Sequence, residues 1–303
     1  MTLATVEFAS ETVRRETLAH DVVERFYEGL NEMFSGDLSI MDDTWTHTSD
    51  AALLSPYGGR AMGWTDIRRL FERDAELKHG GHVWPRDLMV RWGRELAYSV
   101  GIERGKVVTS TDRTIEADIR ATNLLRLEDG VWRVFYHHTD PLLEMQEASG
   151  WKWDDFGSIR GDRADTGILK ALDRYYEAIR AMFDGDLMPM ERLWAKTDDV
   201  TLAAPTGNIQ VGWYAVRTEL ERHTNQDVRG RFETKDPWVR IYDDMALASY
   251  RVWGPDLTIN GKPYPFDLRA TTLFRHDGGE WRIVHHHTDY AKRLSDLCGG
   301  MTK

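Results

Sequence analysis

The chain repeats itself once, at an offset of 149 residues. Residues 26–45 read FYEGLNEMFSGDLSIMDDTW and residues 175–194 read YYEAIRAMFDGDLMPMERLW, with 9 of 20 positions identical. Residues 117–140 and 266–289 agree at 13 of 24 positions. Two copies at so long a period are two whole domains, because solenoid repeats run to about 20–50 residues. The predicted organisation is a first domain over residues 1–148, a linker over 149–163 and a second domain over 164–303.

Composition narrows the classes of protein that fit. The chain has 303 residues and a formal net charge of −11, so an acidic surface argues against nucleic acid as a partner. Its single cysteine, Cys298, excludes an internal disulfide and any multi-cysteine metal site. No apolar run reaches the length of a membrane span, and the first 20 residues do not read as a secretory leader. We expect a cytoplasmic chain that does not bind membranes.

Each copy begins with helices and ends with strands. Apolar side chains recur at helical spacing up to Gly36 and Gly185, and glycine is typical of a helix C-terminus. Asp37 and Asp186 follow directly and are typical of the cap of a next, short helix. A third helix is predicted after each Gly-Trp pair. Four strands follow in each copy, in the first over 87–92, 95–103, 117–127 and 131–138, which predicts an α+β fold.

The last strand of each copy is rich in histidine. It carries five of the chain's eleven histidines, His137, His138, His285, His286 and His287. Successive strand residues point to opposite faces, and we expect the face that bears Trp132 and Trp281 to lie toward the helices. The same alternation would bring four proton-transfer groups to the inner end of a cavity, namely Tyr136, His138, His285 and His287. The alternative is that these histidines make only structural hydrogen bonds.

A metal site on this strand has little support. Three consecutive histidines cannot all reach one ion, because the middle one points to the opposite face. No HExxH motif accompanies them. We predict no metal site and keep metal-dependent chemistry as a minor alternative.

The neighbouring strand and the first helix supply further candidates. An arginine in mid-strand, Arg120 or Arg269, is costly to bury without an anionic partner. We expect these two to stabilise negative charge on a substrate. The alternative is an ion pair within the domain, with Asp118 or Asp267 of the same strand or Glu28 or Glu177 of the first helix. The predicted substrate-binding residues are Tyr27, Tyr176, Trp64, Trp213, Thr122 and Thr271.

Nucleotide and acyl-enzyme motifs are missing from the sequence. It contains no Walker loop, no GxGxxG after a predicted strand and no GxSxG. We therefore expect no organic cofactor.

Each copy resembles a SnoaL-like domain of the nuclear-transport-factor-2-like superfamily. The resemblance rests on the opening amphipathic helix, the FxGDL turn, the Gly-Trp pair and the closing Trp-Arg-Val/Ile-x-x-His-His-Thr-Asp strand. It implies two tandem cone-shaped domains, each with three helices packed on a curved, mostly antiparallel sheet that encloses a pocket. The superfamily includes ketosteroid isomerase-like enzymes, scytalone dehydratase-like lyases, polyketide cyclases, epoxide hydrolases and proteins that only bind or assemble.

Two further expectations come from this resemblance. Superfamily members commonly pair through their sheets, so we expect the two copies to form an intrachain pseudo-dimer through the face bearing Phe135, His137, Val284 and His286, and further self-association stays open. The closing histidines also resemble the HHHSS ending of iota-class carbonic anhydrases. Thr-Asp replaces the two serines in both copies, and Tyr136 replaces the first histidine of the first copy.

The sequence thus favours a general acid/base enzyme of the lyase or isomerase type. Its predicted substrate is a small hydrophobic molecule, aromatic or polycyclic, and its predicted catalytic groups are His138, His287, His285, Tyr136, Arg120 and Arg269. The first alternative is a protein that binds a small ligand or assembles without catalysis. The second is a metal-dependent or iota-carbonic-anhydrase-like enzyme.

Overall fold

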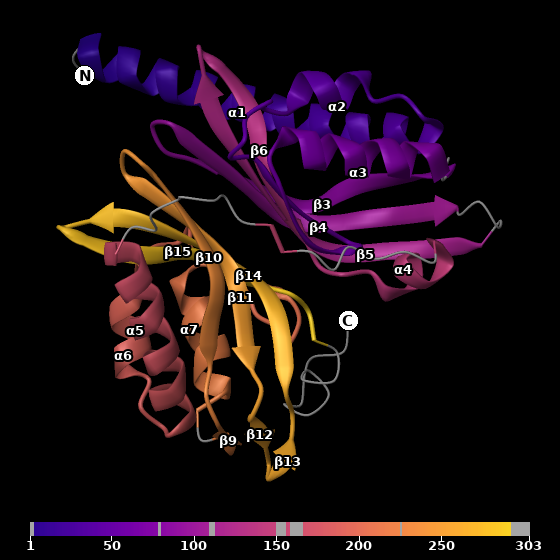
Figure 1. Ribbon diagram of the computed structural model, residues 1–303. Coiled ribbons are helices and arrows are strands. Elements are labelled where there is room, and N and C mark those ends of the chain that lie inside the picture. The colour runs from indigo at the N-terminus through magenta and orange to yellow at the C-terminus, as the bar shows by residue number, and fades with distance from the viewer. Residues whose placement is uncertain are drawn as a thin grey trace. The chain divides into compact units, whose positions relative to one another are not determined.

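The chain folds into two compact units, Met1–Ile159 and Arg160–Lys303. The structure, a computed structural model, describes residues 3–77, 80–108, 113–149, 156–157, 166–224 and 226–291 (Figure 1). Cys298 and most of the predicted linker over 149–163 lie outside the described residues. No helix within the described ranges is both long and apolar enough to cross a lipid bilayer.

The first unit is a six-stranded sheet with helices on one face. Its sheet has the order β2-β1-β6-β5-β4-β3. The strands are β1 (Ala52–Ser55), β2 (Gly58–Met62), β3 (Gly80–Trp92), β4 (Leu96–Val108), β5 (Thr114–Glu128) and β6 (Val131–Thr139). The helices are α1 (Leu3–Ser35), α2 (Ser39–Thr44), α3 (Trp64–Leu77) and α4 (Leu143–Ser149). In Figure 1, α1, α2 and α3 lie together over the strands.

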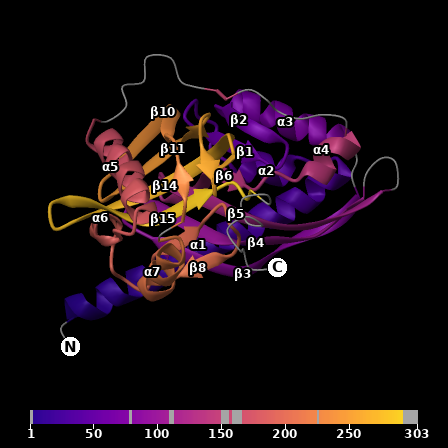
Figure 2. The same ribbon diagram turned by 90° about the horizontal axis from the view of Figure 1, so that it is seen from below.

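The second unit repeats this plan and adds a small sheet. Its main sheet has the order β10-β11-β14-β15-β7-β8, and a three-stranded sheet has the order β13-β12-β9. The strands are β7 (Thr201–Ala203), β8 (Ile209–Val211), β9 (Val228–Arg229), β10 (Glu233–Tyr242), β11 (Met245–Gly254), β12 (Thr258–Ile259), β13 (Lys262–Pro263), β14 (Phe266–Asp277) and β15 (Glu280–Thr288). The helices are α5 (Thr166–Phe183), α6 (Met188–Leu193) and α7 (Trp213–Arg222). Figure 2 shows α5 beside α6 at one side of β14 and β15.

The α+β fold with two tandem units is confirmed, and the local signals explain it. α1 ends where Gly36 takes φ = +100°, and Gly185 takes φ = +98° at the equivalent place. Oδ1 of Asp37 accepts the backbone N–H of Ser39 at 2.8 Å, and the pKa of Asp37 is lowered mainly by that hydrogen bond. Asp186 holds Met188 in the same way at 3.0 Å. Each aspartate thus binds the backbone N–H two residues on, but the residue at the helix N-cap is the next one, Leu38 or Leu187, so the predicted caps are displaced by one residue.

The prediction missed the short strands that make each sheet mixed. β1 runs parallel to β6, whereas the other strand pairs of the first sheet are antiparallel. With four residues in β1 and five in β2, the two strands give too little alternation to be detected from the sequence. They matter for function because β1 carries pocket residues next to the histidine strand.

The described part of the linker lies on the first unit. Phe156 forms a parallel bridge with Arg60 of β2, and the fully buried Arg60 guanidinium lies 4.0 Å from the Phe156 ring centroid. Arg60 also donates from Nε and Nη2 to the carbonyl oxygen of Gly157, at 3.0 and 2.7 Å. The segment 156–157 is thus attached to the unit that precedes it. Trp151 and Trp153 lie outside the described residues.

A β-bulge interrupts the alternation of the histidine strand. On β6, Tyr136 is opposite Leu124 of β5, but the next residue of β5, Leu125, is opposite Val134. Phe135 is therefore an extra residue with no counterpart on β5. The second unit repeats this exactly at Val284 of β15.

The bulge reverses which residues face the helices. Before it, Trp132 and Val134 lie in the core beneath the helices, as the alternation predicts. After it, His137 faces Phe26 of α1, with ring centroids 5.0 Å apart. His286 faces Tyr175 of α5 in the same way, at 4.9 Å. The bulge thus turns the even-numbered His138 away from the helices and the odd-numbered His137 toward them.

Candidate functional site

Each unit has a pocket between its helices and its sheet. The first pocket, in the first unit, has a volume of about 70 Å³. Its wall is largely apolar, with side chains such as Phe26, Leu30, Phe34 and Ile119. Four residues with ionisable side chains also line it, Tyr57, Asp74, Glu103 and His137. Such a small group of polar atoms in an apolar cavity is typical of a ligand or active site.

Glu103 and His137 form the inner polar group of the first pocket. Oε1 of Glu103 lies 3.6 Å from Nε2 of His137, and both side chains are at most 7% exposed. Oε1 accepts no hydrogen bond from the described residues. Burial without a hydrogen bond is costly for a carboxylate, and it raises the pKa of Glu103 to about 8, although a hydrogen bond from Tyr27 offsets part of the rise. Glu103 is therefore mostly a neutral acid at pH 7.

A hydrogen-bonded relay fixes the state of His137. Asn123 presents Oδ1 to Nδ1 of His137 at 2.6 Å, while its Nδ2 donates to Oγ of Ser99 at 3.1 Å. Since an amide oxygen only accepts, Nδ1 of His137 carries the proton. In the neutral imidazole Nε2 then has the lone pair, and Nε2 faces Glu103. In that state the pair combines a neutral acid with a base, and both groups are on the pocket wall.

A second polar group lies elsewhere on the same wall. The hydroxyl of Tyr57 donates to Oδ1 of Asp74 at 2.7 Å. The pKa of Tyr57 is raised, first by burial and then by the charge of Asp74. Tyr57 thus stays protonated and holds the carboxylate in place.

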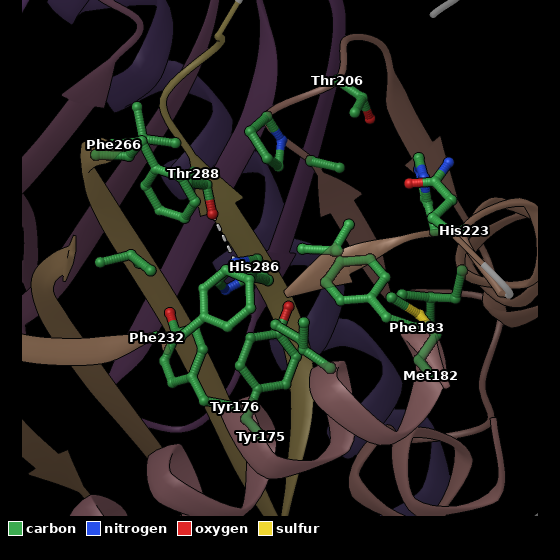
Figure 3. Close-up of a pocket in the computed structure, with 18 of the residues that line it drawn as sticks. Tyr175, Tyr176, Met182, Phe183, Thr206, His223, Phe232, Phe266, His286 and Thr288 are labelled. Atoms are coloured by element: carbon green, nitrogen blue, oxygen red, sulfur yellow. Dashed lines mark hydrogen bonds between the residues drawn. The ribbon is translucent and has the colours of Figure 1, made fainter. Parts of the chain in front are cut away.

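The second pocket, in the second unit, is larger and more apolar. Its volume is about 130 Å³. Figure 3 shows aromatic side chains of α5 and of the sheet gathered around it, with His286 and Thr288 on the strand side and His223 at the far end. Where the first pocket has Glu103, the second has Val252, 149 residues later. The two pockets therefore differ in the group that matters most for acid/base chemistry.

Three polar side chains on the inner wall of the second pocket, Tyr176, His286 and Thr288, are linked by hydrogen bonds through two residues behind the wall. Tyr176 donates to the hydroxyl of Tyr250 at 3.0 Å, and Tyr250 meets Oγ1 of Thr272 at 2.8 Å. Thr272 in turn meets Nδ1 of His286 at 2.9 Å, and Nε2 of His286 meets Oγ1 of Thr288 at 2.7 Å. We call these five side chains the hydroxyl chain. Both nitrogens of its histidine are engaged.

The far end of the second pocket carries an ion pair. Oε1 of Glu219 lies 3.1 Å from Nε2 of His223 and accepts from Thr206 at 3.3 Å, and Arg222 donates to Oε2. The pKa of Glu219 is lowered, chiefly by its hydrogen bond with His223. This end of the pocket therefore holds a carboxylate rather than a neutral acid.

The structure does not bring the four predicted proton-transfer groups to the pocket walls. Tyr136, His138, His285 and His287 are fully buried in the strands, but the bulge leaves His137 and His286 as the histidines that line the pockets. Oγ1 of Thr201 lies 2.7 Å from Nδ1 of His285, so that histidine makes the structural kind of contact that was the alternative. The sequence also placed His137 and His286 on the sheet face away from the helices, through which the two domains were expected to pair. That placement of the two histidines is wrong, because both face the helices.

The two arginines have partners other than the expected ones. Arg120 forms a two-point ion pair with Asp140, from Nε to Oδ2 and from Nη2 to Oδ1, both at 2.7 Å. Arg269 binds Asp289 in the same way at 2.9 and 3.0 Å. These pairs, each at most 7% exposed, anchor the residue that follows the histidine strand. The expected partners lie elsewhere, since Asp118 is 3.6 Å from Arg86 and Asp267 binds Arg251.

Of the predicted substrate-binding residues, only Tyr176 lines one of these two pockets, the second one. Tyr27 is a core residue whose hydroxyl reaches Glu103. Trp64 stacks on His47, with centroids 4.5 Å apart, and Trp213 lies 5.9 Å from Nζ of Lys196. Thr122 and Thr271 are opposite His138 and His287, while their neighbours Asn123 and Thr272 contact the pocket histidines.

Sequence reasoning missed Glu103, although the repeat contains a signal for it. The inward positions of β4 near it are Gly101, Gly105 and Val107, so an acid among them is unusual. Its counterpart in the second copy is the apolar Val252. An acid that replaces an apolar residue in one copy of a duplicated domain indicates a function particular to that copy.

The comparisons place this chain in a family. The family profile described as SnoaL-like domain matches residues 21–143 and again 168–291. The chain belongs to the SnoaL-like family. The resemblance seen in the sequence, with two tandem domains of this kind, is thus confirmed.

Individual relatives are distant. The F-box protein SKIP8 of Arabidopsis thaliana is 25% identical over 163 residues, which cover 53% of this chain and 63% of that protein. A candidate dehydratase of the NTF2-like family from Streptomyces avermitilis is 21% identical, with a TM-score of 0.36, and the match covers 41% of this chain and 94% of the other. An NTF2-like superfamily protein from Salmonella enterica is 18% identical over 41% of this chain and 89% of its own, with a TM-score of 0.33.

The side chains that could together hold a metal ion lie on α1 and not on the histidine strands. Within the described ranges, the His, Asp and Glu side chains close enough together to hold an ion are the exposed His20, Asp21 and Glu24 of α1. No strand histidine belongs to such a group among the described residues.

Proposed function

We propose that the first pocket catalyses proton transfer on a small, uncharged carbonyl compound, as a lyase or an isomerase. The observation that carries this proposal is the pair Glu103 and His137, buried on the pocket wall. Oε1 of Glu103 lies 3.6 Å from Nε2 of His137 and accepts no hydrogen bond from the described residues. The SnoaL-like fold supports it only as a class, since the fold serves many activities.

The pair supplies a base and an acid at once. Nε2 of His137 takes a proton from the carbon next to the substrate carbonyl, and the C–H electrons form a carbon–carbon double bond. The protonated Oε of Glu103 gives its proton to the carbonyl oxygen, which yields an enol, or to a departing hydroxyl group, which leaves as water. The proton on His137 then returns to Glu103, and both groups regain their starting state. Asn123 holds His137 in the productive tautomer throughout.

The pocket restricts the substrate to a small molecule without charge. Its volume of about 70 Å³ is roughly half of the ~150 Å³ cavity that holds one benzene ring in an engineered protein. An anion would face the carboxylate of Asp74, and its transfer from water to apolar walls is costly. Of the hydrophobic substrates expected from the sequence, the volume favours the small end, with a five-membered cyclic ketone, which is about as large as benzene, as the upper limit.

The test is deuterium incorporation and dehydration measured by proton NMR. Cyclopentanone in D₂O reports proton abstraction next to the carbonyl, and 3-hydroxycyclopentanone reports loss of water. We expect Glu103→Gln and His137→Asn each to lower the enzymatic rate by about 10²–10⁴-fold. The matched controls are Glu116→Gln on the exposed part of β5 and His82→Asn on exposed β3, which should keep the wild-type rate.

Two results would overturn the proposal. One is a wild-type protein that accelerates neither reaction. The other is a rate that Glu103→Gln and His137→Asn leave intact. If cyclopentanone binds but does not exchange, the protein is a ligand-binding module, which is the rival hypothesis from the sequence.

The remaining expectations stay proposals. We keep the domain limits 1–148 and 164–303 with the linker between them, a cytoplasmic location, and pairing of the two domains within the chain.

A further inference from the structure

We propose that the second pocket is a separate binding site for an uncharged, apolar molecule the size of one substituted aromatic ring, and that it holds this molecule without converting it. The pocket of about 130 Å³ is close to the ~150 Å³ that accommodates one benzene ring. This site differs from the first pocket in size, charge and hydrogen bonding. Its ligand class follows from those three differences.

The walls suit an aromatic ring. Phe232 lies at the centre of a cluster of rings, with its centroid 6.2 Å from Tyr176, 6.1 Å from Phe183 and 5.7 Å from Phe266 (Figure 3). Centroid distances between 4.5 and 7 Å are those at which aromatic pairs attract. A ligand ring that enters this cluster gains the same contacts. Val228 and Ile259, from the small three-stranded sheet present in this unit, also line the cavity.

The hydroxyl chain leaves the inner wall of this pocket without a free base. Tyr176 donates to Tyr250, Tyr250 and Thr272 share a hydrogen bond, and Thr272 and Thr288 engage Nδ1 and Nε2 of His286. A hydroxyl group therefore engages each ring nitrogen of His286 in either tautomer. The imidazole lone pair that serves as a base in the first pocket is thus engaged inside the wall of the second.

The inner wall also has no acid. Val252 occupies the position of Glu103, and the carboxylate that the pocket does contain, Glu219, is bound by His223, Thr206 and Arg222 at the far end. The lowered pKa of Glu219 keeps it ionised at neutral pH. An anionic ligand would be repelled by this carboxylate, and it would lose its hydration on entering the apolar cavity. The pocket therefore selects uncharged molecules.

Binding is measured by ¹⁹F NMR with two probes of similar size. We expect 4-fluorotoluene to bind the full-length protein at one site with a Kd on the order of 0.1–1 mM, as for a small apolar ring with few heavy atoms. We expect 4-fluorobenzoate to bind at least tenfold more weakly. Equal binding of the two probes would refute the proposed selection against charge.

Matched variants assign the probe to a pocket. Leu268 and Ile119 are equivalent residues that line the second and first pockets. Leu268→Trp should weaken 4-fluorotoluene binding at least tenfold, whereas Ile119→Trp should retain it. The reverse pattern would place the probe in the first pocket and overturn the proposal.

A third variant enlarges the second pocket instead of filling it, so it tests the ligand position without adding a bulky side chain to the core. Phe232→Ala removes the central ring of the cluster, so it should admit 1-fluoronaphthalene at least fivefold more tightly than the wild type does. An unchanged affinity would contradict the assigned ligand position.

The claim that the second pocket does not convert its ligand is tested separately from the proposed function. If Glu103→Gln retains cyclopentanone exchange and Leu268→Trp abolishes it, the second pocket is the reactive one and this part of the inference fails. Loss of exchange in Glu103→Gln, with 4-fluorotoluene binding retained, supports the inference. Binding of 4-fluorotoluene does not depend on whether the first pocket is an enzyme, so each proposal can fail alone.

Discussion

Replacing Glu103 by glutamine should change how the stability of the first unit depends on pH. Burial raises the pKa of Glu103 from 4.5 in the unfolded chain to about 8 in the fold. Between these values the folded protein keeps a proton that the unfolded chain releases. The unfolding free energy therefore falls as the pH rises through this window, by up to ~1.4 kcal/mol per pH unit. Glutamine has nearly the same shape and does not ionise, so the variant lacks this loss.

The size of the effect follows from the two pKa values. Ionisation of Glu103 in the unfolded chain costs the wild type about 1 kcal/mol of stability at pH 5 and about 3 kcal/mol at pH 7. The unfolding free energy of Glu103→Gln should thus rise relative to the wild type by about 2 kcal/mol between pH 5 and pH 7. Glu116→Gln is the control, because Glu116 is exposed and paired with Lys106 at 3.0 Å. The unfolding free energy of Glu116→Gln should differ from that of the wild type by nearly the same amount at pH 5 and at pH 7.

The assay is urea unfolding at pH 5, 6 and 7, read by hydrogen–deuterium exchange mass spectrometry. Peptides from β4 and β5 report the first unit, and peptides from β11 and β14 report the second as an internal reference. Parallel curves for the wild type and Glu103→Gln would refute the neutral-acid assignment. A variant that becomes less stable than the wild type as the pH rises would show instead that Glu103 is ionised and paired with protonated His137.

Three further outcomes follow from the same geometry. The kcat/KM for cyclopentanone exchange should fall tenfold per unit above about pH 8, because Glu103 must be protonated to act as the acid, and a pH–rate profile measures this. Asn123→Leu should lower kcat by about 10–100-fold with little change in KM, since the variant no longer fixes the tautomer of His137, and steady-state NMR kinetics separate the two constants. Asp140→Asn and Asp289→Asn should each lower the unfolding free energy by about 3–5 kcal/mol, because a buried guanidinium loses its charged partner, and urea unfolding measures the loss. A loss below 1 kcal/mol for both would contradict the structural role of these ion pairs.

Local signals predicted the helices well because their causes are local. The glycine at 36 or 185 and the aspartate after it determine the end of one helix and the start of the next through hydrogen bonds that span two residues. The duplicated sequence then made the two units and their α+β class predictable. None of this depends on contacts between distant parts of the chain.

The candidate site was predicted only in part because it depends on one distant pairing. The histidine strands were correctly identified, but the face of each histidine depends on the bulge, which is defined by pairing with β5 or β14. Phe135 and Val284 are ordinary strand residues, and nothing in their type indicates a bulge. The reversal moved the site from His138 and His287 to His137 and His286. The arginines were wrongly assigned for a related reason, since their partners Asp140 and Asp289 follow the next strand.

The bulge also bears on how such a strand tolerates a change of register. If the bulge were lost and Phe135 took a regular place in the ladder, strict alternation would turn the residue one position further along toward the helices. In this chain that residue is another histidine, His138, and the second copy has a histidine on each side of His286. Consecutive histidines thus make the pocket insensitive to a one-residue slip: either register presents an imidazole to the cavity. A run of identical residues in a strand can in this way preserve a side chain's function while the backbone register drifts during evolution.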